Sequence, residues 1–365
     1  MIAALRKAVD GLLGRGDSSI TVPPFDGALQ PNQMLEHAEV VAKLPEGEDI
    51  ATDGKTIYVA DGRTIRRLDG ETLTEVRRFD RTVTALCLLP GGGLAVALDG
   101  TEVRIFAAIE GADSGKSFTG PNMTAVNALA AGPSGTVLAT DGSQAEPYAR
   151  WAHDLMSRGA AGRLLSIDIA GGGVSVLASG LRYAFGAIPF DGDTLVSESW
   201  RHRIVAISAS GFVRPVFTDL PVYPSRMSKA AGGGYWLTCF TGRTQLVEFV
   251  LRENAYRRRM MAEIAPEHWI APRLRSGKSF KEPMQGAHLK TMGVVKPWAP
   301  PRSYGLVIRL SETGLPQYSL HSRVDGENHG IVAAVEMGDS LYAMAKGPGR
   351  LLRLPLARVR EELGR

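Results

Sequence analysis

The chain has 365 residues, of which 44% are hydrophobic and 22% are charged, and its formal net charge is +4. This composition is typical of a folded protein, and so small a positive excess argues against a nucleic-acid partner. The only two cysteines, Cys87 and Cys239, exclude a disulfide-stapled scaffold and are typical of a protein from a reducing compartment.

The first predicted element is a helix at the N-terminus. Residues 1–13 carry apolar side chains at helical spacing, interrupted by charges that break the apolar core of a signal peptide. No later stretch reaches the length needed to span a bilayer. We therefore expect a cytoplasmic protein with no transmembrane segment, and a helix lying on a membrane surface is the alternative.

From residue 38 onward one pattern returns: an apolar run, a Gly-rich turn, a second apolar run, a charged turn and a third run. Strands at this spacing, repeated at intervals of roughly 40 to 50 residues, indicate propeller blades rather than alternating strands and helices. Copies of the pattern begin at Asp49, Thr84, Val126, Phe185, Met227 and Ile331. We predict an all-β fold, a six-bladed β-propeller over residues 38–356. Residues 1–37 would hold the N-terminal helix and a ring-closing segment at 22–29, and residues 357–365 a charged tail.

The first five blades are predicted at residues 38–68, 74–107, 117–169, 174–208 and 213–251. The strands of the first blade are expected at 39–44, 49–52, 56–60 and 64–68, with Asp53-Gly54 and Asp61-Gly62 as hairpin turns. The third blade has a long loop, residues 143–163, which carries Trp151 and His153. Long loops on a rigid β scaffold often cap a binding site, so we expect these two side chains to contact a ligand.

A non-repeating insert, residues 252–302, is expected between the fifth and the sixth blades, with a helix at 253–264. The sixth blade would then run from Tyr304 to Leu354. The basic residues of the insert are either a solvated face or a docking site for a protein partner. Trp269 and Trp298 either contribute to a lid over a pocket or anchor the insert on the propeller.

The first strand of each blade lines the central tunnel of a propeller, so the residues that enter these strands converge near one end of the axis. The repeat places there Glu48 with Asp49, Thr84, Asn127, Phe185 or Gly186, Ser225 with Arg226, and residues 328–331. An oxygen-rich set would indicate calcium, which takes about six to eight oxygen ligands. This set is mixed, because it includes an aromatic ring and a guanidinium.

Several phrases of the repeat resemble a known family. They are Gly47-Glu48-Asp49-Ile50, Val126-Asn127-Ala128-Leu129, Tyr223-Pro224-Ser225-Arg226-Met227 and Asn328-His329-Gly330. Through them, residues 20–356 are similar to the strictosidine synthase-like branch of the gluconolactonase, senescence marker protein and paraoxonase superfamily. The resemblance implies a six-bladed propeller with a small-molecule site at the mouth of its tunnel.

The resemblance also implies a possible calcium site, since lactonases of this superfamily bind calcium through a Glu, Asn residues and an Asp on the axis. Glu48 and Asn127 match two of these ligands, but Phe185 and Ser225 stand where two others would be. We therefore expect no cofactor, with an incomplete calcium site at Glu48 and Asn127 as the alternative. We predict instead that Arg226 takes the place of the metal, paired with Glu48 and steered by Asn127. The alternative is that Arg226 points away from the axis.

Strictosidine synthesis itself is not expected, because Val332 stands where the plant enzyme carries its catalytic Glu. The best candidate for proton transfer is His329, since histidine titrates near neutral pH, and a structural histidine is the alternative. We predict a hydrolase of a lactone or related ester, with His329 as acid or base and Asn127 or Arg226 stabilising the oxyanion. The ligand would contact Glu48, Phe185, Ser225, Trp151 and His153. The alternative is a non-catalytic propeller that binds a small molecule or serves as a scaffold.

Overall fold

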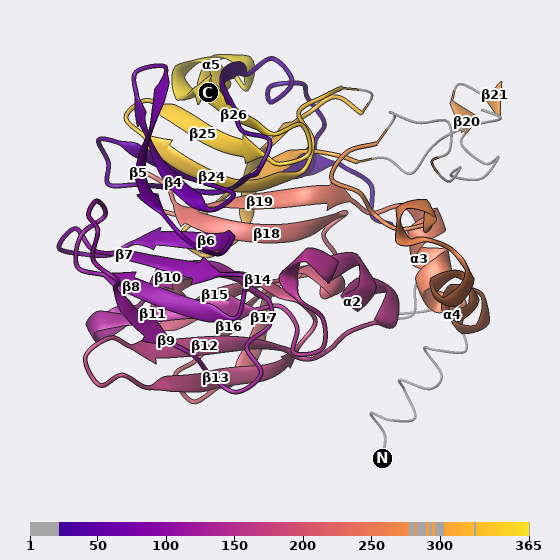
Figure 1. Cartoon of the computed structure of the whole chain (residues 1–365). Coiled ribbons are helices and arrows are strands. Elements are labelled where there is room, and N and C mark those ends of the chain that lie inside the picture. The colour runs from indigo at the N-terminus through magenta and orange to yellow at the C-terminus, as the bar shows by residue number, and fades with distance from the viewer. Residues whose placement is uncertain are drawn as a thin grey trace.

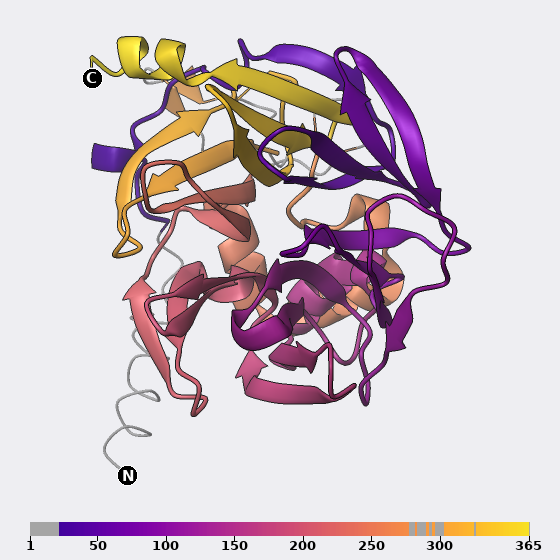
Figure 2. The same ribbon diagram turned by 90° about the vertical axis from the view of Figure 1, so that its left-hand side faces the viewer.

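The computed structural model describes residues 22–276, 282, 290–291, 294–295, 303–324 and 326–364. Within these residues, six four-stranded antiparallel sheets surround a central axis (Figures 1 and 2). The predicted all-β, six-bladed propeller is therefore confirmed. The predicted N-terminal helix and Trp298 lie outside the described residues.

The first three blades follow the chain, and in each the first strand is the innermost. Blade one comprises β2 (Gly47–Thr52), β3 (Ile57–Asp61), β4 (Thr64–Asp69) and β5 (Thr72–Arg78). Blade two comprises β6 (Val83–Leu88), β7 (Leu94–Leu98), β8 (Glu102–Phe106) and β9 (Lys116–Phe118). Blade three comprises β10 (Val126–Ala131), β11 (Thr136–Asp141), β12 (Gly162–Asp168) and β13 (Val174–Leu181).

The last three blades include one that is interrupted and one that is closed by the N-terminal strand. Blade four comprises β14 (Ala184–Phe190), β15 (Asp193–Glu198), β16 (Arg203–Ile207) and β17 (Val213–Phe217). Blade five comprises β18 (Val222–Lys229), β19 (Tyr235–Gly242), β22 (Leu306–Leu310) and β23 (Pro316–His321). Blade six comprises β24 (Ile331–Met337), β25 (Ser340–Ala345), β26 (Arg350–Pro355) and β1 (Glu39–Lys43).

The predicted hairpin turns of blade one are present. Gly54 adopts φ 89° and Gly62 adopts φ 59°, a backbone region that glycine enters without the steric cost that a side chain would add. Most side chains of the inner and second strands are buried, and apolar clusters fill the spaces between neighbouring blades. Local turn chemistry and apolar strands thus specify each blade.

The ring closes differently from the prediction. Residues 39–43 were assigned to the first blade, but β1 pairs antiparallel with β26 and completes the sixth blade. The predicted starts of blades two to five are displaced by one strand in the same way, because residues 74, 117, 174 and 213 lie in β5, β9, β13 and β17, the outermost strands of the preceding blades. Residues 22–29, predicted to close the ring, lie instead against blade five, where Ser319 Oγ donates to Ala28 O at 3.0 Å. Joining the two ends of the propeller in one sheet holds the ring shut.

The insert also lies elsewhere than predicted. Because β19 and β22 are hydrogen-bonded neighbours, the insert interrupts blade five rather than separating blades five and six. It contains α3 (Gln245–Arg252), α4 (Asn254–Glu263) and a ribbon of β20 (Lys290–Thr291) and β21 (Val294–Val295). The run at 304–310 is thus the third strand of a blade, although by sequence it reads as the start of a new one.

The helices mark one face of the ring. The inner strands begin at the face where α2 (Trp151–Ser157), α3 and α4 lie, which we call the helical face (Figure 1). They end at the opposite face, formed by the Gly-rich hairpins and seen in Figure 2, which we call the turn face. The C-terminal α5 (Leu356–Glu362) packs Leu356 and Val359 against blade six. In the part of the chain that the structure describes, every helix is too short or too polar to cross a membrane.

Candidate functional site

Arg226 and Glu48 meet at the axis. Arg226 Nη2 lies 3.1 Å from Glu48 Oε1, and each side chain is 7% exposed. Arg226 Nη1 donates to the carbonyl oxygens of Glu48 at 3.0 Å and Val332 at 3.3 Å, and Nη2 donates to that of Thr84 at 2.8 Å. The predicted pair is therefore present, and one guanidinium from blade five joins the inner strands of blades one, two and six.

Asp49 is a second carboxyl group beside Arg226. Its Oδ2 lies 3.3 Å from Arg226 Nε, and its two oxygens accept from the backbone N–H groups of Ile50 and Leu86, each at 2.9 Å. Burial raises the pKa of Asp49 to about 6, although Arg226 opposes that rise. Burial alone would lower the pKa of Arg226, but Asp49, Tyr148 and Glu48 raise it above its ordinary value. Arg226 is therefore a permanent cation.

Lys346 and Tyr148 bind the other side of Glu48. Tyr148 Oη donates to Glu48 Oε1, Lys346 Nζ donates to Glu48 Oε2, and Lys346 Nζ lies 3.3 Å from Tyr148 Oη. Burial would raise the pKa of Glu48, but Lys346 and Arg226 outweigh burial and lower it. Burial, with the charge of Glu48, raises the pKa of Tyr148 well above its usual value. The Lys346 side chain is 28% exposed, so it is where this charged cluster meets solvent.

Neither Lys346 nor Tyr148 was predicted from the sequence. Lys346 directly follows β25, the second strand of its blade, and second strands end at the helical face. The repeat could therefore have indicated Lys346, because the residue that follows each second strand lies at the helical face. Tyr148 lies in the long third-blade loop, in a one-turn 3-10 helix at Tyr148–Arg150 before α2. No local sequence pattern indicates that Tyr148 contacts Glu48.

Asn127 does not steer Arg226. Its Nδ2 donates to Ala184 O at 2.9 Å, and Thr140 Oγ1 donates to its Oδ1 at 2.7 Å. The first bond ties blade three to blade four, and the second lies within blade three. The predicted steering role is therefore wrong, because the polar atoms of Asn127 are taken up by other partners.

Ser225 and Phe185 flank Arg226 in different ways. Ser225 is fully buried, and its hydroxyl lies 2.8 Å from Thr238 Oγ1 within blade five. The Phe185 ring lies under the guanidinium, with its centroid 5.2 Å from Arg226 Cζ, a cation–π contact. Phe185 also packs against Tyr148 and Phe240 at ring distances of 6.2 and 5.7 Å. An aromatic ring thus stabilises the cation at the position where the resemblance implied a metal ligand.

His329 is held by two protein partners. Its Nδ1 lies 2.6 Å from Ser303 Oγ and its Nε2 lies 2.7 Å from Arg323 O, and the residue is 2% exposed. Since a carbonyl only accepts, Nε2 carries the proton and Nδ1 accepts from Ser303. The geometry favours the structural alternative for His329 over proton transfer.

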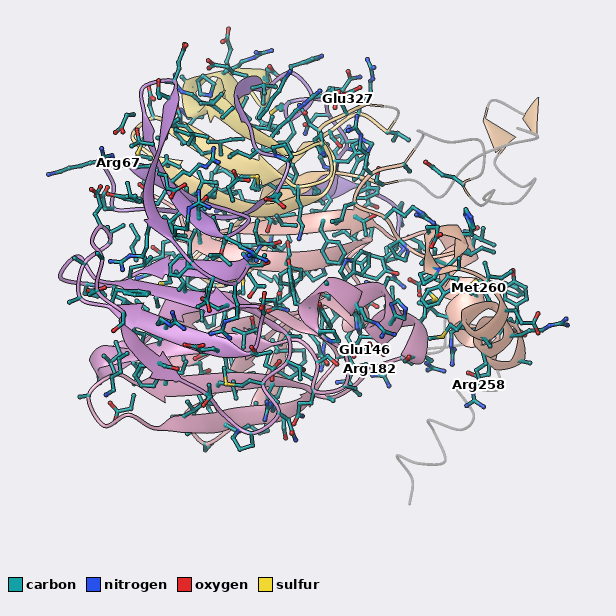
Figure 3. The ribbon with its side chains drawn as sticks, in the orientation of Figure 1. Arg67, Glu146, Arg182, Arg258, Met260 and Glu327 are labelled. Atoms are coloured by element: carbon teal, nitrogen blue, oxygen red, sulfur yellow. The ribbon has the colours of Figure 1, made fainter. Side chains whose placement is uncertain are left out.

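Trp151 and His153 belong to α2 and help to hold the helical face together. The Trp151 ring packs on Phe240 at 5.5 Å, and the His153 ring stands edge-on to Trp269 of the insert at 4.6 Å. Trp269 is 1% exposed and donates to Ile264 O at 2.8 Å, so it serves as an anchor. Burial, and then the charge of Arg150, lower the pKa of His153. Figure 3 shows Glu146 and Arg182 near α2 and Met260 and Arg258 on α4, at the same side of the molecule.

A second buried charge cluster ties the insert to blade four. His202 Nε2 lies 3.5 Å from Glu248 Oε1 of α3, and Arg243 Nε lies 3.1 Å from the same oxygen. Burial would raise the pKa of Glu248, but His202 and Arg243 lower it to about 2. His202 lies in the turn after β15, the second strand of blade four, and the turns that follow second strands belong to the helical face.

The calcium alternative does not fit these residues. Among the described residues, no three His, Cys, Asp or Glu side chains gather closely enough to hold a metal ion. Glu48 is bonded to Arg226 and Lys346, and both cations would repel a divalent ion at this position. Asn127 faces Thr140 and Ala184 instead. Glu48 and Asn127 therefore do not form a calcium cage.

Comparisons with known proteins agree with the fold. No family model matches the chain. An adipocyte plasma membrane-associated protein of Salmo salar is 28% identical over 262 residues, which are 67% of this chain and 55% of that protein. The chain thus spans about half the length of this curated relative.

Two solved structures have the same architecture. A gluconolactonase from Xanthomonas campestris is 13% identical with a TM-score of 0.52, over 87% of this chain and 88% of its own. An aldose sugar dehydrogenase from Streptomyces coelicolor, solved with PQQ bound, is 16% identical with a TM-score of 0.50. The match covers 92% of this chain and 99% of its own. The chain therefore has the fold of gluconolactonase-like propellers. At such low identity this likeness concerns the fold alone, which carries different chemistries.

Proposed function

We propose that the protein is a metal-independent hydrolase of small lactones or related esters, acting on the helical face beside Lys346 and Glu48. The observation that carries this proposal is the contact between a partly exposed ammonium group and a buried, ionised carboxylate. The gluconolactonase-like fold supports the same class of reaction. Membership of the strictosidine synthase-like branch remains a prediction from the sequence.

Lys346 is suited to stabilise the charge that develops in ester hydrolysis. When water adds to the carbonyl carbon, negative charge collects on the carbonyl oxygen, and a fixed cation nearby lowers the barrier. Lys346 is the member of the axial cluster that reaches solvent, whereas Arg226 is buried behind Glu48. Lys346 is thus assigned the role that the sequence analysis gave to Arg226 or Asn127.

Glu48 is the proposed base. Its Oε1 accepts from both Arg226 and Tyr148, whereas among the described residues its Oε2 accepts from Lys346. A carboxylate oxygen accepts two hydrogen bonds, so Oε2 keeps one position for a water molecule. The water's proton passes to Glu48 as the new C–O bond forms. The bond to the leaving oxygen then breaks and that oxygen takes the proton, so a lactone and water yield a hydroxy acid.

The test is hydrolysis of δ-valerolactone and phenyl acetate in the presence of calcium or of a chelator. We expect turnover that the chelator leaves unchanged and that Lys346→Met removes, with Lys55→Met, a change at an exposed turn, as the matched control. Loss of turnover in the chelator would contradict the metal-independent mechanism. Full activity of Lys346→Met would contradict the assigned site.

A non-catalytic role is the second candidate, favoured by the three protein partners that already hold Glu48. In that case Lys346 would bind an anionic metabolite without turning it over. Absence of turnover, together with a rise in the melting temperature on adding gluconate that Lys346→Met abolishes, would support this function instead.

A further inference from the structure

Arg257 is a buried cation in α4, on the side of that helix that packs inward. The residue is 5% exposed and shares this side of α4 with Met260. Met260 belongs to the same apolar cluster as Leu155 and Met156 of α2. Arg257 therefore lies where the insert meets the helix of the third blade.

The guanidinium of Arg257 has neutral hydrogen-bond partners. Its Nη1 donates to Leu251 O, and its Nη2 donates to Asn254 Oδ1 at 2.9 Å. Within the described residues it forms no ion pair. Two nearby carboxylates are bound elsewhere, Glu248 by Arg243 and Glu263 by Arg259. A buried arginine without a carboxylate is unusual, because the cost of taking its charge out of water is not offset by an opposite charge.

Two further arginines bring positive charge to the same place. Arg158 is the residue that ends α2, with φ 59°, and Arg258 follows Arg257 on α4 (Figure 3). Both are exposed, and in the part of the chain that the structure describes neither forms an ion pair. Burial lowers the pKa of Arg257, and the charges of Arg158 and Arg258 lower it further. The junction between α2 and α4 thus gathers three like charges that repel one another.

An anion bound at this junction would relieve the repulsion, and a phosphate group fits it best. The planar guanidinium matches phosphate oxygens in a bidentate geometry. A phosphate monoester carries about 1.5 to 2 negative charges near pH 7 and three acceptor oxygens, whereas a carboxylate carries one charge and two oxygens. The exposed Arg158 and Arg258 can donate to such a group, while Arg257 acts on it through its charge.

We propose that the junction of α2 and α4 binds the phosphate group of an anionic ligand, with Arg158 and Arg258 as its donors and Arg257 as a buried counter-charge. The phosphate belongs either to a soluble phosphomonoester or to a phospholipid headgroup, which share this chemistry. The site goes beyond the proposed hydrolase, because it lies at the C-terminal end of α2 and includes neither Lys346 nor Glu48.

The experiment is a ³¹P NMR titration of the full chain with inorganic phosphate at constant ionic strength. We expect saturable binding that Arg158→Gln and Arg258→Gln each weaken by about tenfold or more, since each removes a charge-assisted hydrogen bond. Arg259→Gln is the matched control on the same helix, because its side chain is 77% exposed and already paired with Glu263. This control should bind phosphate as the wild type does. Acetate should displace phosphate only at a concentration about tenfold higher or more.

Vesicles distinguish the two sources of the phosphate. Co-sedimentation with phosphatidylcholine vesicles that contain phosphatidic acid, lost in Arg258→Gln and kept in Arg259→Gln, would assign it to a lipid headgroup. Binding of inorganic phosphate without co-sedimentation would assign it to a soluble ligand. The proposal is overturned if neither probe binds, if Arg259→Gln weakens binding as much as Arg258→Gln, or if acetate competes on equal terms. These measurements do not depend on turnover, so they test the site whether or not the protein hydrolyses lactones.

Discussion

Arg226 of blade five lies 3.1 Å from Glu48 of blade one, so a guanidinium occupies the axis of this propeller. The cation neutralises buried carboxyl groups and hydrogen-bonds to three inner strands. A buried ion pair of this kind is stabilising only while both partners remain, because either one left alone is an uncompensated charge.

Removing this cation should therefore destabilise the ring. We expect Arg226→Met to lower the free energy of unfolding by about 3–5 kcal/mol, since it leaves Asp49 buried without its cation and Glu48 with Lys346 as its remaining cation. Arg226→Lys should lower the free energy of unfolding by less, because lysine keeps the positive charge and lacks only the planar guanidinium with its several N–H donors. Urea titrations would measure both. The control is Arg259→Met, because the Arg259 side chain is 77% exposed and forms an i,i+4 ion pair with Glu263. An equal loss of stability in this control would contradict the stabilising role of Arg226.

Asp49 should make stability depend on pH. Its pKa is about 6 in the folded protein and about 3.9 unfolded, so the folded state binds more protons between these values. The contribution of Asp49 to stability is thus fully present below pH 4 and is lost as pH rises to 6, by about 2–3 kcal/mol. Relative to Asp49→Asn, the wild type should lose stability over that window. Parallel pH profiles of the two proteins in chemical denaturation would contradict the raised pKa.

The His202, Glu248 and Arg243 cluster should hold α3 on blade four. We expect Glu248→Gln to weaken this attachment by about 1–3 kcal/mol, since it removes the buried negative charge that pairs with Arg243 and contacts His202. Hydrogen exchange of α3 should accelerate, while that of the blades stays unchanged. Glu253→Gln, at an exposed position between α3 and α4, is the matched control, and equal exchange in the two variants would argue against the cluster as the anchor.

His329 should matter for stability rather than for turnover. His329→Gln is expected to cost about 1–3 kcal/mol, because the partners Ser303 and Arg323 O lose bonds made by the imidazole. Its kcat for lactone hydrolysis should remain at the wild-type value, in contrast to Lys346→Met. A pH profile of kcat that loses its near-neutral limb in His329→Gln would restore the catalytic role.

Much of the fold was predictable because its signals are local. Gly54 and Gly62 in their turns, and apolar runs at regular spacing, specify hairpins without reference to the rest of the chain. The same repeat, aligned on itself, placed Glu48 and Arg226 at one level of the axis. Charge complementarity then predicted their contact, because a guanidinium buried there needs a carboxylate.

Ring closure and the position of the insert were not predictable in this way. Residues 39–43 and 306–310 have the apolar pattern of strands, but a pattern does not say which edge a strand pairs with. That choice belongs to the closed ring, where β1 joins β26 and β22 joins β19 across the insert. Pairing between distant segments is decided by which edges remain open in the assembled sheets.

By itself, then, the sequence determined the hairpins, the number of blades and the level at which Glu48 and Arg226 enter the axis, since these follow from turn chemistry and strand periodicity. Only the tertiary structure decided what surrounds that pair. Tyr148 and Lys346 reach Glu48 from 100 and 298 residues away, and Ser303 reaches His329 from an interrupted blade. These contacts depend on side chains brought together by the closure of the ring, which no local pattern encodes.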